Sequence, residues 1–349
     1  MEKVEGEMKN IKLYYNDSNI IQAVTDGTTN SCVQIPPKFL YPEIVCSEPY
    51  GQSYDSLVEA IDHRCQMDDK PIFIRRGSSY GDLLMLIPII NLLHEKTGRD
   101  IVVSCNNNFH NIFKFVKGVV GTCSLCRIPP ASKYSIGITF DGILERDRTI
   151  FDGAHRLDIY GNMVFGELFN DIYSVLDVKK AFKLVNIPQE IGESVTRLIN
   201  EVVGEVQETK TLLGIALQAN RQEYSLPGEV ISYLVAKIQS RVRRYIPVSL
   251  TKEKPYGAFP VGQNIGMLGV LEALKRCSLL ITVDTGIYWV SHYTGTPTIL
   301  VLNSNNTTSN ITSHNQYHPK AISMIVDYNQ IHNPTLWGVL FNQIKEIER

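Results

Sequence analysis

Residues 71–94 read PIFIRRGSSYGDLLMLIPIINLLH, and this stretch decides the fold. It begins with a short apolar strand at 71–75, continues through a polar turn with two glycines at 77–82, and passes into a helix at 83–94. The helix is apolar on nearly every face, which predicts that it is buried. A strand, a tight turn and a buried helix in this order indicate the first half of a βαβ unit.

The same alternation continues along the chain on both sides of a polar helical segment at 190–209. We predict further strands at 100–104, 135–140, 212–217, 244–249, 279–283 and 298–302. We predict further helices at 108–116, 228–241, 267–276, 287–293 and 334–347. Strands that alternate with helices favour parallel sheets covered on both faces.

A chain of 349 residues exceeds one ordinary domain, so we expect two. The predicted fold class is α/β, with two Rossmann-like, doubly wound domains at 71–195 and 205–330 that face each other across a cleft. Residues 1–70 form a small extension with short strands, which we expect to pair with the edge of the following sheet. Residues 331–349 form a C-terminal helix.

Composition excludes several classes of function. The chain has 34 basic and 36 acidic residues and a formal net charge of −2, which gives no wide electrostatic surface for nucleic acid or anionic membranes. Its N-terminus shows no secretory signal, and no apolar run approaches a membrane span. An odd number of cysteines, seven, favours reduced thiols. We therefore expect a soluble, cytoplasmic protein without a transmembrane segment.

The first candidate site is the turn at 77–82, GSSYGD. Its glycines allow a tight turn and a close approach to a ligand, and its serines can cap the helix. The loop residues that we assign here are Ser78, Ser79, Tyr80 and Gly81. Asp82 places a carboxylate at a helix N-terminus, where it can take a proton from a hydroxyl group. The alternative is that Asp82 only stabilises the helix dipole.

Two more candidates follow strands of the second domain. Asp284, Thr285 and Gly286 open a helix, where backbone N–H groups and a hydroxyl form an anion site suited to a diphosphate. Asp284 can bind sugar hydroxyls, or it can simply cap the helix. Arg221 follows the strand at 212–217 and can hold a phosphate through two hydrogen bonds, unless it is a solvated loop arginine.

Metal-ligand patterns are weak in this sequence. Cys123 and Cys126 have a metal-type spacing, but no second Cys/His pair lies at zinc-ribbon distance. His155 and His292 are isolated in sequence, and such histidines are usually structural. We therefore expect no metal in the catalytic site.

Three motifs in order resemble glycosyltransferase family 9, the ADP-heptose:lipopolysaccharide heptosyltransferases. The stretch 74–84, IRRGSSYGDLL, is similar to the opening strand, turn and Gly-Asp of that family. Residues 154–158, AHRLD, are similar to its His-x-(Val/Ile)-(Asp/Glu) segment. The C-terminal signature resembles 271–286 together with Gly-Thr-Pro at 295–297. The resemblance covers about residues 71–305.

This resemblance implies a GT-B fold and inverting sugar transfer without a metal or other cofactor. It implies that Asp82 is the general base. It also implies that Asp284, Thr285 and Gly286 form the loop that binds the donor sugar and its diphosphate.

The chain departs from the family pattern at two donor-site positions. Arg221 lies near the basic loop that binds the donor phosphate, but the lysine expected three residues later is Tyr224. The histidine expected three residues after Gly286 is Trp289. We assign all three side chains to the donor site and expect Trp289 to stack on a base or sugar face. The departures leave the donor sugar open.

The sequence therefore predicts a glycosyltransferase that uses a nucleotide-sugar donor. Its acceptor is a glycan, a protein or a modified nucleobase. One alternative is another GT-B enzyme, such as a nucleotide-sugar epimerase. The other is a non-catalytic module that binds sugar nucleotides.

Overall fold

The computed structural model divides into two compact units, each described here by itself. The first comprises Met1–Ser78, Leu86–Asp147 and Arg156–Ala181, and the second comprises Ser79–Met85, Arg148–His155 and Phe182–Arg349. The structure describes residues 11–12, 14–15, 21–22, 39–40, 53–54, 70–77, 79–125, 136–141, 155–161, 164–165, 175–204, 209–219, 225–252, 255–263, 265–304, 316–327 and 334–347.

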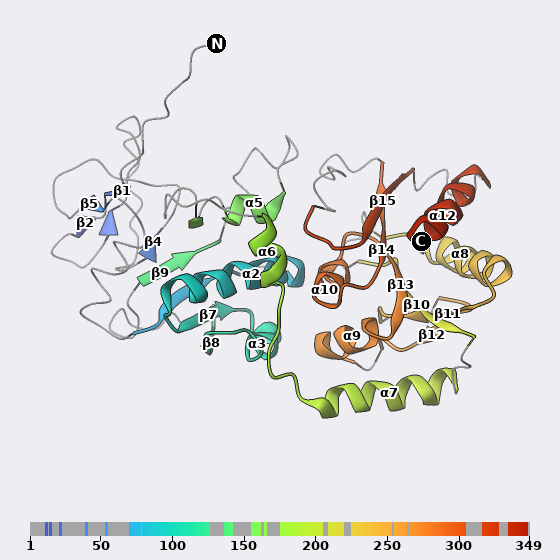
Figure 1. The fold of residues 1–349 in the computed structure, drawn as a ribbon, viewed down its shortest axis with the longest axis horizontal. Coiled ribbons are helices and arrows are strands. Elements are labelled where there is room, and N and C mark those ends of the chain that lie inside the picture. Colours follow the sequence, from blue (N-terminus) through green and yellow to red (C-terminus); the bar gives the residue numbers. More distant parts are fainter. Residues whose placement is uncertain are drawn as a thin grey trace, which may run out of the picture. The chain divides into compact units, whose positions relative to one another are not determined.

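The first unit is built on a five-stranded sheet (Figure 1). In spatial order its strands are β4 (Phe39–Leu40), β9 (Ile136–Thr139), β6 (Ile72–Arg75), β7 (Ile101–Cys105) and β8 (Val119–Ser124). Every pairing is parallel. β4 comes from the N-terminal extension and pairs with β9, so the prediction that this extension covers a sheet edge is confirmed. Two further strand pairs of the extension are antiparallel: β1 (Ile11–Lys12) with β5 (Ser53–Tyr54), and β2 (Tyr14–Tyr15) with β3 (Ile21–Gln22).

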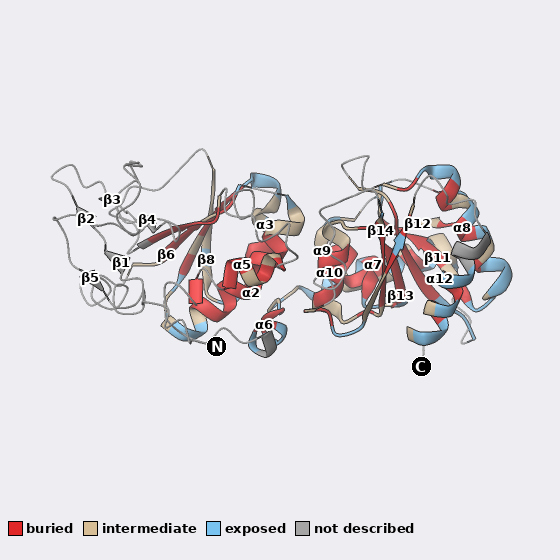
Figure 2. Cartoon of the chain, turned by 90° about the horizontal axis from the view of Figure 1, so that it is seen from above, coloured by how far each residue is buried: buried red, intermediate tan, exposed pale blue. Residues whose placement is uncertain are grey.

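The helix after β6 is α2, Tyr80–Thr97. Its apolar residues from Leu83 to Leu93 are all at least nine-tenths buried, as predicted, and Figure 2 shows much of the helix in red. It begins three residues earlier than predicted, because the carbonyl of Ser79 already accepts a helical hydrogen bond from the N–H of Leu83 at 3.2 Å. Asp82 therefore lies within the first helical turn.

The other helices of the first unit are short. They are η1 (Asn107–Phe109), α3 (His110–Phe113), α5 (Arg156–Gly161) and α6 (Val175–Ala181). The helix predicted at 108–116 is therefore too long. After Phe113 the chain makes tight turns, and Gly118, with φ of +79°, adopts the left-handed conformation that glycine tolerates before β8 begins.

The second unit contains a six-stranded sheet. In spatial order its strands are β12 (Phe259–Pro260), β11 (Tyr245–Ser249), β10 (Thr211–Ala216), β13 (Cys277–Thr282), β14 (Thr298–Asn303) and β15 (Ala321–Val326). All of its pairings are parallel. The sequence did not predict β15. This edge strand, AISMIV, is mostly apolar in sequence but only partly buried, with Ile325 54% exposed.

Helices cover both faces of this second sheet (Figures 1 and 2). α8 (Gly228–Arg241) and α12 (Pro334–Ile347) lie on one face, and α9 (Met267–Leu274) and α10 (Gly286–Thr294) lie on the other. The predicted bounds of α8 and α12 are confirmed. α7 (Gln189–Val203) ends earlier than its predicted limit of 209, because Gly204 has φ of +81° and stops the helix.

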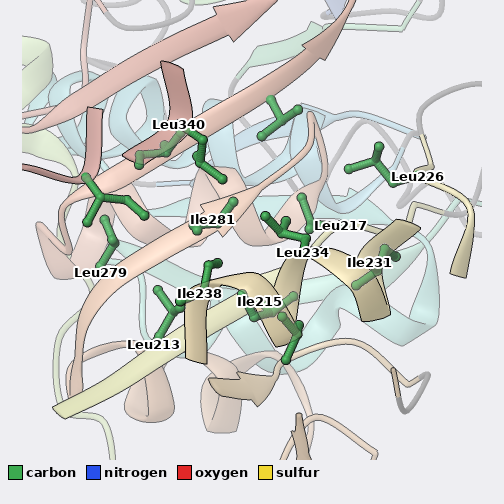
Figure 3. Packing of buried hydrophobic residues seen from close by; sticks show 14 of the residues in the cluster. Leu213, Ile215, Leu217, Leu226, Ile231, Leu234, Ile238, Leu279, Ile281 and Leu340 are labelled. Atoms are coloured by element: carbon green, nitrogen blue, oxygen red, sulfur yellow. The ribbon is translucent and has the colours of Figure 1, made fainter. Parts of the chain in front are cut away.

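The core between the second sheet, α8 and α12 follows the two-residue period of a strand. Alternate residues of β10 and β13 enter one buried cluster with three residues from successive turns of α8 (Figure 3). These residues are Leu213, Ile215, Leu217, Leu279, Ile281, Val283, Ile231, Leu234 and Ile238. Burying a side chain of this size contributes about 1.5–3 kcal/mol, so this apolar layer fixes the position of the neighbouring strand ends.

Both sheets reverse their strand order at one point. In the first unit the chain runs from β6 outward through β7 and β8, and then returns to place β9 on the other side of β6. In the second unit it runs from β10 through β11 and β12, and then places β13 on the other side of β10. Such doubly wound sheets bind ligands beyond the carboxyl ends of the two strands that flank the reversal.

None of the helices in the described ranges is long and apolar enough to cross a membrane.

Candidate functional site

The turn after β13 forms the N-terminus of α10. Thr285 is extended, with φ of −136° and ψ of 172°, and its Oγ1 accepts a hydrogen bond from the N–H of Ile287 at 3.2 Å. Within the described ranges no acceptor is bonded to the N–H groups of Thr285 and Gly286. Two N–H groups therefore remain at the positive end of a nine-residue helix, an arrangement that attracts anions.

Asp284 precedes this helix and is half-buried. Burial raises the pKa of Tyr288 well above its usual value, and the negative charge of Asp284 raises it further. The Tyr288 phenol therefore stays protonated. The predicted contact of Asp284 with sugar hydroxyls stays a prediction.

Asp82 lies in the first turn of α2 and is half-buried. The hydroxyl of Ser79 donates a hydrogen bond to Oδ2 of Asp82 at 3.1 Å. Ser79 thus orients the carboxylate with its side chain, while its carbonyl accepts the helical bond from Leu83. This geometry suits a general base and also suits an acid that stabilises the helix dipole.

The structure brings the first turns of α2 and α10 together within the second unit. A Cβ atom on Gly286 would lie 3.1 Å from Cβ of Tyr80 and 3.8 Å from the backbone nitrogen of Gly81. The hydroxyl of Tyr293 on α10 also donates a hydrogen bond to the carbonyl of Leu84 on α2. The first turn of α2, which contains Asp82, and the Asp284–Gly286 turn therefore lie side by side, although they are far apart in sequence.

The prediction that Trp289 stacks on a donor base or sugar is wrong for this structure. Trp289 is only 2% exposed, because it lies on the inner face of α10. Its ring stacks on His292, with centroids 4.8 Å apart and an interplanar angle of 20°, and it meets His155 edge-on at 5.6 Å. Trp289 instead lies under Gly81, where a Cβ atom would be 3.1 Å from its Cδ1.

The histidines around Trp289 are buried side chains with fixed ring orientations. The N–H of Lys320 donates to Nδ1 of His318 at 3.0 Å, so the neutral His318 ring carries its proton on Nε2. That group lies 2.9 Å from Oγ of Ser291. We predicted from the sequence that His155 and His292 are structural residues, and their packing in this cluster agrees with that prediction. No sequence pattern indicated that His155 would contact Trp289.

The loop after β10 is closed at its base. Oγ of Ser225 accepts a hydrogen bond from the N–H of Ala219 at 2.8 Å and donates one to the Ala219 carbonyl at 3.1 Å. Arg221 and Tyr224, which belong to this loop, lie outside the described residues, as does Ser78 of the first candidate turn. The two ends of the Arg221 loop are therefore fixed directly after β10, beside the reversal point.

Further polar side chains lie next to this loop, and the sequence did not indicate them. The hydroxyl of Thr251 donates to Oε1 of Gln218 at 3.3 Å and lies 3.2 Å from Oγ of Ser249. Gln218 follows β10, whereas Ser249 and Thr251 stand at the end of β11. Isolated serine and threonine residues carry no motif, so only the strand order reveals that they share an edge.

Of the cysteine pair with metal-type spacing, the structure describes only Cys123, and Cys126 lies outside the described residues. Burial raises the pKa of Cys123, although a hydrogen bond from Ser104 opposes the shift, and Cys105 has its pKa raised to about 12, mainly by burial. No group of three metal-ligating side chains occurs among the described ranges.

Comparisons with solved structures identify the fold. Neither a protein-family model nor a curated protein matches the sequence, but solved structures match it in three dimensions. One is the glycosyl transferase family 9 protein of Veillonella parvula, at 15% identity and a TM-score of 0.56, covering 74% of this chain and 87% of that one. The fold is that of a family 9 glycosyltransferase.

A second solved structure agrees with this family 9 fold. The iron-containing dodecameric glycosyltransferase TibC of enterotoxigenic E. coli H10407 matches at 13% identity and a TM-score of 0.52, covering 90% of this chain and 77% of that one. The predicted α/β class, with two parallel sheets covered by helices, is therefore confirmed. The resemblance that three short motifs indicated is confirmed at the level of the fold.

Proposed function

We propose that this protein is an inverting glycosyltransferase that moves a sugar from a nucleoside diphosphate donor to an acceptor hydroxyl without a divalent metal. The observation that carries the proposal is the packing of the first turn of α2 against the first turn of α10. It brings the helical turn that carries Asp82 next to the α10 N-terminus, which has two backbone N–H groups at the positive end of a helix. A base and an anion site in one place suit sugar transfer from a diphosphate.

The proposed reaction uses each of these groups. Asp82 takes the proton from the acceptor hydroxyl as its oxygen attacks the anomeric carbon of the donor. The new carbon–oxygen bond forms on the face opposite the diphosphate, and the bond from the anomeric carbon to the diphosphate oxygen breaks. Negative charge then develops on the leaving diphosphate. The N–H groups of Thr285 and Gly286, together with Arg221, stabilise this charge.

The position of the proposed donor site rests on strand order. Asp284–Gly286 follow β13, and the closed loop with Arg221 follows β10. β10 and β13 flank the reversal point of the second sheet, where ligands of doubly wound sheets collect. A solved TibC structure with a TM-score of 0.53 is described as a complex with ADP-D-β-D-heptose, which supports a nucleotide sugar as the class of donor for this chain.

The test is the variant Asp82→Asn, which keeps the size of the side chain and one oxygen that can accept from Ser79, but removes the base. A thermal-shift panel of nucleotide sugars first identifies the donor, because a bound donor raises the apparent melting temperature. We expect Asp82→Asn to retain the donor shift and to lose transfer by about 10²–10⁴-fold. Asp100→Asn, which changes an exposed aspartate before β7, is the matched control.

Three outcomes would contradict the proposal. Transfer by Asp82→Asn at the wild-type rate would remove Asp82 as the base. Epimerisation of the donor without transfer would favour an epimerase. Donor binding without turnover across glycan, protein and nucleic-acid acceptors would favour a binding module.

A further inference from the structure

A proline interrupts the hydrogen bonds of α2. Pro88 lies inside the helix, and proline has no N–H group. In an uninterrupted helix the N–H of residue 88 donates to the carbonyl of Leu84, four residues earlier. Pro88 therefore deprives the Leu84 carbonyl of its helical donor. Leu84 is only 1% exposed, so water has little access to this carbonyl, and buried carbonyls are almost always paired.

A side chain of α10 supplies the missing donor. The hydroxyl of Tyr293 donates a hydrogen bond to the Leu84 carbonyl, although the two residues are 209 positions apart in sequence. Burial raises the pKa of the Tyr293 hydroxyl well above its usual value, so this group keeps its proton and stays a donor. The Tyr293 ring meets Phe182 edge-on, with centroids 5.2 Å apart, which supports this orientation. The tyrosine hydroxyl thus satisfies a requirement that Pro88 creates.

The same face of α10 makes two further contacts with the first turn of α2. Gly286 approaches Tyr80, and Gly81 approaches Trp289, each so closely that a Cβ atom on the glycine would lie 3.1 Å from the neighbouring side chain. Gly286, Trp289 and Tyr293 are three and four residues apart, the spacing that places residues on one face of a helix. The glycine contacts set how closely the two helices approach, whereas the hydrogen bond of Tyr293 is directional. All three contacts lie within the second unit.

We infer that Tyr293 is a positioning residue for Asp82: its hydroxyl takes the place of the N–H that Pro88 lacks, and it holds the helical turn that carries the base against α10. The inference rests on the proposed function, to which it adds a residue that takes no part in proton transfer or donor binding. Asp82 precedes Leu84 by two residues in the same part of α2. A shift of the Leu84 backbone toward another donor therefore moves Asp82 relative to α10.

Hydrogen exchange in the full-length protein tests the substitution of one donor for the other. Tyr293→Phe keeps the ring and removes the hydroxyl, and Pro88→Ala restores an N–H that can donate to Leu84. Exchange of the segment 79–87, followed by mass spectrometry, reports the opening of the first turn of α2. We expect Tyr293→Phe to speed this exchange by about 5-fold or more, the effect of leaving a buried carbonyl unpaired. The effect should be much smaller in the Pro88→Ala background. Tyr233→Phe, at a 42% exposed tyrosine of α8, should exchange like the wild type.

Transfer kinetics test the positioning role. At saturating donor and acceptor, and well below the melting temperature, Tyr293→Phe should lower kcat by about 10–100-fold, because a small displacement of a catalytic group has an effect of this size. The KM for the donor and the donor-induced thermal shift should stay near their wild-type values, since the N–H groups at the α10 N-terminus are unchanged. Pro88→Ala/Tyr293→Phe should recover part of the lost kcat. A purely structural role would lower the melting temperature and leave kcat unchanged.

The outcomes separate this inference from the proposed function. Equal effects of Tyr293→Phe on exchange with and without Pro88→Ala would overturn the link to the proline. An unchanged kcat in Tyr293→Phe, or a kcat and a donor KM that worsen together, would overturn the positioning role. Absence of transfer by the wild type across the donor and acceptor panels would instead overturn the proposed function, and the exchange measurements would still decide whether Tyr293 holds the first turn of α2.

Discussion

Gly81 at the start of α2 lies directly on the ring of Trp289 in α10, so close that a Cβ atom on Gly81 would be 3.1 Å from Cδ1 and 3.4 Å from Nε1 of the indole. Trp289 is held in place by His292 and His155 on its other sides. The small size of glycine at this position therefore suits a contact within the second unit. This contact sets how closely the first turn of α2 packs against α10.

Gly81→Ala should move these two helix starts apart. Overpacking of a well-packed contact costs about 1–3 kcal/mol, so we expect a lower free energy of unfolding in urea. We also expect a loss of transfer activity that exceeds the loss of donor affinity, because the base shifts while the α10 anion site stays in place.

The control for this prediction is Gly228→Ala at the start of α8, where an added Cβ meets nothing within 4 Å. This variant should be as stable as the wild type or slightly more stable. In the double variant Gly81→Ala/Trp289→Leu, the smaller side chain makes room for the methyl group. Strictly additive destabilisation in that double variant would show that Trp289 does not limit the space at Gly81.

Much of the fold could be predicted because its helices and strands carry clear periodic signals. The buried helix α2, the amphipathic helix α8 and the strands β6, β7 and β10 follow directly from the apolar pattern. Their ends were less certain where a single glycine decides the conformation, as Gly204 does after α7. The edge strand β15 was missed although five of its six residues are apolar, because so short an apolar run does not by itself distinguish a strand from other buried segments.

The candidate site was only partly accessible from the sequence. Asp82 and the Asp284–Gly286 turn could each be found as a residue type after a strand, but their proximity depends on packing between distant segments. The wrong prediction for Trp289 has the same cause, because its surroundings also depend on packing between distant segments. An aromatic residue near a donor motif suggests stacking on a ligand, whereas its burial depends on His155 and His292, which no local pattern connects to it.

Removal of metals should leave the transfer activity unchanged. The sequence has no paired-carboxylate Asp-x-Asp motif beside the candidate donor site, and the α10 N-terminus offers positive potential to the leaving diphosphate. The measurement is transfer rate before and after dialysis against EDTA. A loss that Mg²⁺ or Mn²⁺ restores would contradict metal independence, and a loss that only Zn²⁺ restores would indicate a zinc site at Cys123 and Cys126.

Alkaline pH should destabilise the protein partly through Cys277. Burial raises the pKa of this thiol to about 12, although Arg276 opposes the shift. The unfolded chain loses the proton near pH 9, whereas the folded chain keeps it, so the free energy of unfolding falls as the pH rises from about 9 toward 12. Urea denaturation at pH 8, 9 and 10 should show a smaller loss for Cys277→Ala. An identical pH dependence in that variant would contradict the prediction.

Arg221 should bind the diphosphate of the donor. Its loop is closed by the Ala219–Ser225 hydrogen bonds directly after β10, and β10 flanks the reversal point together with β13, which leads into Asp284–Gly286. A planar guanidinium and a helix N-terminus at one sheet edge are complementary donors for an anion. Arg221→Ala should therefore weaken donor affinity by about 1.5–3 kcal/mol, the typical contribution of a hydrogen bond to a charged group. Calorimetric titration of the donor into the wild type, Arg221→Ala and Arg243→Ala decides the question, since Arg243 is an exposed arginine before β11, at the opposite end of the strands. If Arg221→Ala and Arg243→Ala bind the donor equally well, then Arg221 is a solvated loop residue, and the N–H groups of α10 alone hold the diphosphate.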